Sequence, residues 1–260
     1  MEHIFTKKRV QFIVLVIYEF FIGYLALSFD FNALWYLGMS WVIPTLFFLY
    51  KLHINRYQYI LEALMWSIPG SLLIDWVGHY SKAWSYWGNP LFASTGINIL
   101  GIPLESFVWG SVFWIFYVVI YEYFFDENRA SNFNNKEKFV AFGLVILSLV
   151  MVLLINLYQP TIPFFYSLIL LSIIFIIVIS LIPYRQLIPR VLKFGLIVFI
   201  LGLQIEFFAL KLNLWFFSGG DYLKEIQFFG NFIPIEELLW WVMVPMAIAA
   251  IHEIFADNHR

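Results

Sequence analysis

Two stretches of the sequence match each other at a distance of 131 residues. Gly101–Trp109 reads GIPLESFVW and Phe232–Trp240 reads FIPIEELLW. The offset holds without a gap beyond these nine positions, so that Asp75 falls on Glu206. Acids, prolines and tryptophans that match at one fixed offset rarely arise by chance. The sequence therefore predicts a tandem repeat whose two copies fold alike.

Both copies have the composition of membrane-embedded chains. Hydrophobic residues make up 62% of the 260 residues and charged residues only 12%, whereas soluble domains carry about 25% charged residues. The apolar residues come in blocks near the length of about 20 residues that a membrane-spanning helix requires. Trp and Tyr gather toward the ends of these blocks, as they do at membrane–water interfaces. The composition thus predicts an all-α integral membrane protein.

Eight apolar blocks can be delimited, and four of them repeat the other four at the offset of 131. They lie near residues 10–29, 33–50, 58–78, 100–124, 138–158, 163–183, 191–213 and 230–255. We expect about eight transmembrane helices in a tandem 4+4 repeat, with copies over 1–126 and 138–260 and a polar linker over 127–137. Because each copy has an even number of spans, the repeats should be parallel.

Positive charge predicts the orientation of these spans. In the eight-span topology, twelve of the 15 Lys and Arg residues fall on the side that holds both termini, and only Lys82, Lys211 and Lys224 on the other. This bias predicts a multi-pass protein of the cell membrane with both termini in the cytoplasm. Residues 10–29 follow basic residues and resemble a signal peptide, but they align with 141–160 inside the chain, which favours a retained span.

Acidic residues recur at matching places in the two copies. Asp75 and Glu206 lie near the outer ends of the third and seventh spans, and Glu105 and Glu236 lie about one turn inside the fourth and eighth, with Glu237 adjacent. A carboxylate inside a membrane costs at least about 2.5 kcal/mol, so it faces the bundle interior or a wet cavity. The repeated set predicts a polar chamber in the outer half of the bundle.

Tryptophans accompany these acids in both copies. Trp84 and Trp215 follow the first acid of each copy by nine residues, and Trp109 and Trp240 follow the glutamate by four, with Trp241 next in the chain. A spacing of four places both side chains on one helix face. We expect these five tryptophans to line the chamber and to bind the substrate.

A purely structural role for the acids is the competing interpretation. The aspartate and glutamate at the ends of the third and seventh spans can be solvated at a membrane surface. The glutamates of the fourth and eighth spans lie in first turns, where the helix dipole favours negative charge. The repetition of the set together with tryptophan favours a functional site.

Most of the remaining acidic residues in or near the spans are expected at the cytoplasmic surface. Glu122 and Glu253 lie 17 residues beyond the first-turn glutamates, about 25 Å along a helix, and are expected at the solvated cytoplasmic face. Glu62 aligns with Lys193 and is expected at the inner surface. Glu19 lies deeper in the first span, as a proton-relay group or a structural hydrogen-bonding residue.

Several kinds of site are absent from the sequence. There is no Cys, which excludes disulfides, thiolate catalysis and Cys-ligated metals. The five His residues have no metal-like spacing, and no basic patch is large enough to bind nucleic acid. No Asp-rich pair suits a Mg²⁺-diphosphate, and no Gly-x-Gly-x-x-Gly follows a strand. We therefore expect no metal and no cofactor, and acid chemistry on an apolar compound remains.

The repeated pattern resembles the integral-membrane lycopene cyclase family of the heterodimeric type. It consists of an acid, a Trp nine residues later, then Pro-x-Glu with a further Glu or Ser, and a Trp. The resemblance implies that two homologous domains are fused here in one chain, in contact with a lipophilic polyene in the bilayer and with other carotenoid enzymes. Ser106 departs from the family, which usually has a second Glu there. Membrane carotenoid hydratases are similar as well.

The resemblance and the residue chemistry agree on a non-redox cyclisation of a polyene end group. A neutral carboxylic acid, kept so by an apolar site and a neighbouring carboxylate, protonates a terminal alkene. Aromatic faces then stabilise the cation. Glu236 and Glu237 are the expected donor pair, with Asp75, Glu105 and Glu206 as orienting or proton-accepting groups. The alternatives are a hydratase, another membrane terpenoid cyclase, or a scaffold or transporter, although the midplane segments carry few of the polar groups that transporters place there.

Overall fold

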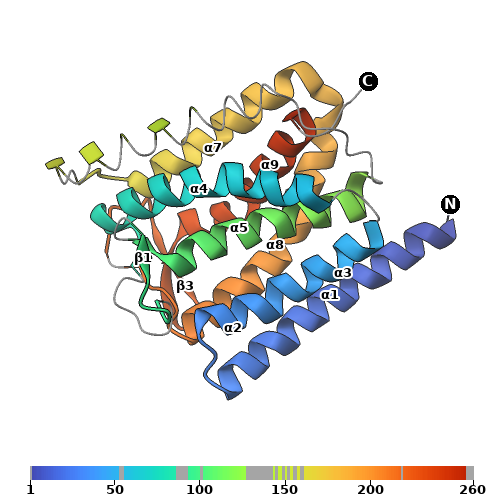
Figure 1. The fold of residues 1–260 in the computed structure, drawn as a ribbon, viewed down its shortest axis with the longest axis horizontal. Coiled ribbons are helices and arrows are strands. Elements are labelled where there is room, and N and C mark those ends of the chain that lie inside the picture. Colours follow the sequence, from blue (N-terminus) through green and yellow to red (C-terminus); the bar gives the residue numbers. More distant parts are fainter. Residues whose placement is uncertain are drawn as a thin grey trace.

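The computed structural model describes residues 2–52, 56–85, 93–99, 102–126, 161–217 and 219–255, with scattered positions between 143 and 158. The predicted linker 127–137 lies outside the described residues, and so does most of the predicted fifth span, 138–158. Long helices dominate the described part of the chain (Figure 1).

The helices follow the apolar blocks of the sequence. They are α1 (Glu2–Ser28), α2 (Ala33–Leu37), α3 (Ile43–Leu52), α4 (Arg56–Tyr80), α5 (Leu104–Tyr121), α7 (Phe165–Leu181), α8 (Ile188–Lys211) and α9 (Ile235–Phe255). A π-helical turn, η1 (Gly38–Val42), joins α2 to α3, and another, η2 (Glu122–Asp126), extends α5. A 3₁₀ turn, η3 (Ile182–Leu187), leads into α8. Local chemistry explains some boundaries, since the Asn32 side chain caps α2 by accepting from the Trp35 N–H at 3.0 Å.

Five of the described helical segments are long and apolar enough to cross a membrane. They are Lys7–Ser28, Ala33–Leu52, Leu104–Asp126, Ile182–Lys211 and Ile235–Glu253. Phe165–Ile179 is apolar but shorter. Large apolar side chains such as Phe20, Phe21 and Phe175 are exposed on the outside of the bundle. The predicted class, a mostly helical membrane protein, agrees with this architecture.

Two short β-hairpins precede the helices α5 and α9, and neither was expected from the sequence. The first pairs β1 (Asn98–Ile99) with β2 (Ile102–Pro103), and the second pairs β3 (Glu225–Phe228) with β4 (Asn231–Pro234). The apolar run continues from each hairpin into the helix, so the change of element is hidden from a hydropathy reading. The expected starts of these blocks at residues 100 and 230 therefore lie in or beside the hairpins.

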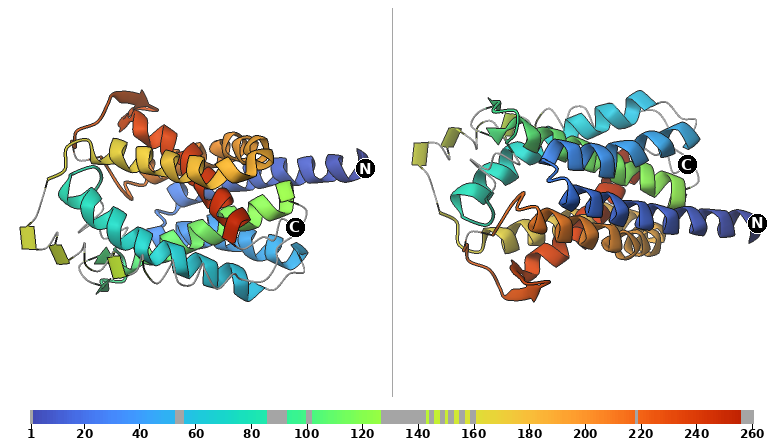
Figure 2. Two further views of the ribbon diagram at one scale, coloured as in Figure 1. Left: turned by 90° about the horizontal axis from the view of Figure 1, so that it is seen from above. Right: turned by 90° about the horizontal axis from the view of Figure 1, so that it is seen from below.

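The helices form two antiparallel pairs at the centre of the bundle. α4 packs against α5 and α8 against α9, and α5 also contacts α9. α1 lies along α8, and α7 lies along α9 (Figures 1 and 2). The start of α1 and the end of α9 lie toward one end of the molecule, with both hairpins at the other. Residues Ser85 and Phe216, which are 131 positions apart, exchange two backbone hydrogen bonds of 2.8 and 3.0 Å.

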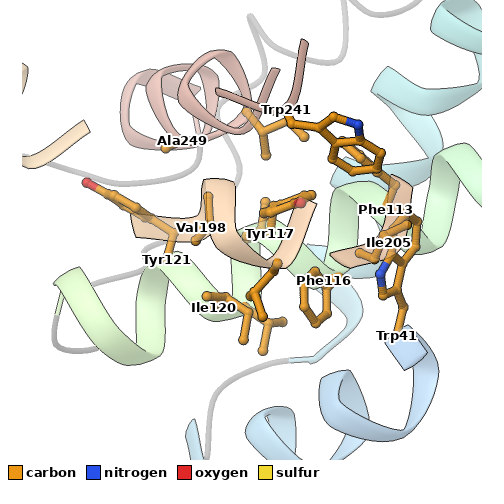
Figure 3. Close-up of a cluster of buried hydrophobic side chains, with 14 of the residues drawn as sticks. Trp41, Phe113, Phe116, Tyr117, Ile120, Tyr121, Val198, Ile205, Trp241 and Ala249 are labelled. Atoms are coloured by element: carbon orange, nitrogen blue, oxygen red, sulfur yellow. The ribbon is translucent and has the colours of Figure 1, made fainter. Parts of the chain in front are cut away.

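The core between the helix pairs consists largely of aromatic and branched side chains. Figure 3 shows Tyr117 and Phe116 of α5 beside Ile205 of α8, with Trp241 of α9 and Trp41 of η1 at its edge. All five are nearly inaccessible to solvent. This packing places the two helix pairs in direct contact and positions the cavity described next.

Candidate functional site

A cavity of about 240 Å³ lies between α4, α5, α7 and α9, beneath the loops that follow α4 and α8. Most of its lining is aromatic: Trp66, Trp84, Trp109, Phe113, Trp114, Tyr166, Trp215, Phe217, Trp240 and Trp241. The polar groups that reach it are Ser67, Ser71, Asp75, Ser106 and Glu237. All five tryptophans expected at the substrate site are therefore brought together in one cavity, together with two of the five expected acids.

Glu237 brings a paired carboxyl group to the cavity from the first turn of α9. Tyr166 of α7 donates a hydrogen bond to Glu237, and the carboxyl group of Glu206 lies beside that of Glu237. Glu206 accepts from the indole N–H groups of Trp215 and Trp241, each at 3.3 Å. Two neighbouring carboxyl groups share one proton more readily than they both ionise, because two adjacent negative charges repel each other. The arrangement therefore suits a pair that holds one proton.

Asp75 and Ser106 form the corresponding pair in the first half of the chain. The Ser106 hydroxyl donates to the Asp75 carboxylate, and both residues line the cavity. Asp75 is the residue 131 positions before Glu206, and Ser106 the residue 131 positions before Glu237. The same two positions thus hold a carboxyl–carboxyl pair in one half and a carboxylate–hydroxyl pair in the other.

The glutamates Glu105 and Glu236 are turned away from this cavity and hold the preceding loops. Glu105 accepts from the Thr95 backbone N–H at 2.6 Å. Glu236 accepts from the Leu223 backbone N–H at 2.7 Å and from the Ser167 hydroxyl at 2.6 Å. Both side chains are buried, and neither lines the cavity. Their contacts suit anchoring of loops better than delivery of protons.

One wall of the cavity carries hydroxyl groups that the sequence analysis did not single out. Ser67, Ser71 and Asp75 are spaced four residues apart on α4, and this spacing places them on one face of the helix. Ser67 and Ser111 of α5 are hydrogen-bonded at 2.8 Å. Ser71 lies against Gly110, where a Cβ atom would come within 2.6 Å of its hydroxyl oxygen. The spacing of the three α4 residues was a signal that could have found this wall.

Tyr166, Trp66 and Trp114 are further cavity residues that sequence reasoning missed. Tyr166 corresponds to Trp35 in the first copy, and Trp35 is exposed, so the repeat offers no signal for it. Trp66 and Trp114 lie deeper along α4 and α5 than the matched acids, with their rings stacked at 6.0 Å and 9°. The tryptophan spacing used for prediction does not extend to them.

The expectation that Glu122, Glu253 and Glu62 lie at a solvated face is wrong. All three are buried, with exposures of 0%, 1% and 0%. His252 lies between two of them, with Nδ1 at 2.8 Å from Glu62 and Nε2 at 2.5 Å from Glu122. Counting residues along a helix gives depth only, whereas charged partners on neighbouring helices allow these carboxylates to be buried.

A second set of ionic contacts continues this buried network. Tyr121 donates to Glu253, and Arg190 of α8 bonds to both Asp126 and Glu253, the latter at 3.2 Å. Helices α4, α5, α8 and α9 are therefore joined by charged side chains at the end away from the hairpins. Among the described residues no cluster of His, Asp and Glu has the arrangement of a metal site.

These features define a mostly helical protein with membrane-length helices and a tryptophan-lined cavity that holds carboxyl groups. No family model, curated protein or solved structure gives a significant match to the chain. The resemblance to the lycopene cyclase family therefore depends on the residues of the repeated motif.

Proposed function

We propose that the chain is a tandem 4+4 parallel repeat whose copies are related by an approximate two-fold axis. A two-fold axis brings equivalent residues together, and the backbone bridge between residues 131 apart fits this relation. Glu122 contacts His252, while Tyr121 contacts Glu253. These contacts join the same two repeat positions with the roles of the copies exchanged. The charge bias of the loops supports a cell-membrane protein with cytoplasmic termini.

We further propose that the protein is a membrane carotenoid cyclase of the lycopene type. The observation that carries this proposal is the cavity itself, in which Glu237, with Glu206 beside it, meets a lining of tryptophans, and Asp75 is also present. An acid next to aromatic faces suits the formation of a carbocation from an alkene, because the faces attract positive charge. The helices would deliver a lipophilic polyene from the bilayer.

The size of the cavity fits one end of a long substrate. Pockets that enclose whole drug-sized ligands measure about 300–1,000 Å³, and this one measures about 240 Å³. A polyene chain would therefore place only an end group inside and extend its remaining length outward. Cyclisation of end groups requires no more than this.

The proposed reaction conserves atoms and electrons. The Glu237–Glu206 pair transfers its proton to the terminal double bond, and a cation forms at the more substituted carbon. A neighbouring double bond attacks that cation and closes the ring. Asp75 then accepts the proton released as the ring double bond forms, and transfer of one proton from Asp75 back to the pair completes the cycle. No oxidant, reductant or cofactor enters the balance.

A hydratase is the second candidate, and the hydroxyl-bearing wall of α4 favours it. Ser67 and Ser71 offer hydrogen bonds to a water molecule beside the site of the cation. Water that captured the cation would give an alcohol in place of a ring. The two reactions share the acid and differ in the occupant of this wall.

Expression in bacteria that accumulate lycopene tests both candidates. We expect the chain alone to convert lycopene into products with one or two rings, detected by chromatography and mass. A hydrated acyclic product, heavier by one water per end, would instead assign the hydratase. Unchanged lycopene in cells whose membranes contain the protein would contradict both.

A further inference from the structure

The stacked pair Trp66 and Trp114 lines the cavity at a distance from the acids. Trp66 precedes Asp75 by nine residues on α4, and Trp114 follows Ser106 by eight on α5, which corresponds to about 12–14 Å along each helix. Both indoles line the cavity, and their rings are nearly parallel. We call this stacked pair of indoles the aromatic floor of the cavity.

A buried triad of Glu62, His252 and Glu122 contacts the floor through the Trp114 indole N–H. The Trp114 indole N–H donates to Glu62 Oε1 at 3.3 Å, and Glu62 Oε2 contacts His252 Nδ1 at 2.8 Å. His252 Nε2 contacts Glu122 at 2.5 Å. A carboxylate only accepts hydrogen bonds, so a protonated imidazole is the form that can donate to two carboxylates at once.

We propose that Trp66 and Trp114 are a binding floor for an organic cation, and that Glu62, positioned by His252 and Glu122, strengthens it. An indole that donates to a carboxylate gains electron density, and the face of its ring attracts cations more strongly. The ligand class is a cation without N–H or O–H donors, such as a quaternary ammonium group. The cation of the proposed cyclisation forms beside the carboxyl groups, so the floor does not depend on the function proposed above.

The floor can be tested by binding alone, on the purified full-length protein in detergent micelles. The probes are geranyltrimethylammonium and its uncharged analogue with carbon in place of nitrogen, and calorimetry gives both dissociation constants. We expect the wild-type protein to prefer the cation. Trp114→Leu and Trp66→Leu should each weaken cation binding about tenfold and change binding of the neutral probe by much less. Trp114→Phe, which keeps an aromatic face, should lose less.

Further variants separate the aromatic floor from other sources of attraction. Glu62→Gln keeps an acceptor for the Trp114 N–H and removes the charge, so it should reduce cation binding a few-fold. Asp75→Asn measures the attraction due to the cavity carboxylate. Trp35→Phe is the matched control, since Trp35 is 64% exposed and lies outside the cavity; it should change nothing.

Two outcomes overturn the floor. One is a preference for the cation that persists unchanged in both leucine variants, and the other is an equal loss of both probes in each. Trp66→Leu leaves the triad intact, so this test survives if Glu62→Gln fails to fold. If the floor variants lose the cation but lycopene is not converted, the cyclase proposal fails and the floor stands. If lycopene is converted and the floor variants bind the cation normally, the floor proposal fails and the cyclase proposal stands.

Discussion

The helix pairs α4–α5 and α8–α9 lie 131 residues apart in the sequence, as the proposed repeat requires, and they differ in what they enclose. Both helices of the first pair line the cavity, whereas no described residue of α8 lines it. The difference lies in the size of the side chains at matching positions: Ser67, Gly70 and Gly110 correspond to Val198, Leu201 and Trp241. The comparison indicates that small residues, more than the backbone fold, open the site.

The glycines of the two pairs show how the space is used. In α8, a Cβ atom at Gly202 would come within 2.7 Å of the Trp241 ring, so this glycine makes room for an indole that fills the second pair. In the first pair Gly110 takes the place of that indole. At Gly70, a Cβ atom would meet nothing within 4 Å, which leaves open space beside α4.

The two helix pairs also differ in the acidic residues that they carry. The second pair holds two carboxyl groups in contact, Glu206 and Glu237, and the first holds Asp75 with a serine hydroxyl. A carboxyl pair suits donation of a shared proton, and a carboxylate that accepts a hydroxyl hydrogen bond suits acceptance of one. The two copies thus have complementary roles in the proposed reaction, one as proton donor and one as acceptor.

We expect the largest loss of product formation from a substitution that removes the proposed proton donor. Glu237→Gln removes the shared proton while keeping an acceptor for the Tyr166 hydroxyl, so the fold should persist. Loss of general acid catalysis typically costs about 10²–10⁴-fold, and we expect product formation to fall by that range. Chromatography of products, normalised to protein in the membrane, measures it. Glu225→Gln, at an exposed carboxylate of β3, is the control, and equal activity of the two variants would remove Glu237 from the mechanism.

A smaller effect is expected from making the first pair resemble the second. Gly70→Leu introduces the residue that α8 has at the matching position and directs it into the cavity. Leucine favours a helix over glycine by about 0.8–1.0 kcal/mol, so thermal stability should hold or rise while product falls about tenfold or more by exclusion of the end group. Gly38→Ala in η1, also in open space, should leave product unchanged. Full activity in Gly70→Leu would place the substrate elsewhere.

The helical part of the fold could be predicted from the sequence because one signal was strong. Apolar blocks of spanning length predicted the positions of the described helices, whereas the repeat of four and four spans stays a prediction. The fixed offset, with tryptophans four and nine residues after acids, selected Trp84, Trp109, Trp215, Trp240 and Trp241, and the structure brings these five together.

The rotation of the helices and the contacts between them could not be predicted from the sequence. The rotation of α5 and α9 turns Glu105 and Glu236 toward loops, and hydropathy patterns do not report rotation in helices that are apolar on all sides. The burial of Glu122 and Glu253 depends on His252, Arg190 and Tyr121 from neighbouring helices. Depth along one helix could not reveal these cross-helix partners.

The smallest effect is expected where the two copies agree. Glu105 and Glu236 each hold a loop through a backbone N–H, at 2.6 and 2.7 Å, so the sequence-based view of Glu236 and Glu237 as equal partners needs revision. Because a glutamine carbonyl still accepts these hydrogen bonds, Glu236→Gln and Glu105→Gln should change product only a few-fold and to the same extent. Alanine at either position leaves a buried N–H unsatisfied, which costs about 1–3 kcal/mol and should lower the unfolding temperature. Product assays and thermal unfolding of all four variants measure this symmetry. Abolished product in Glu236→Gln, with Glu105→Gln active, would show that Glu236 is a proton donor and that the copies differ at this position too.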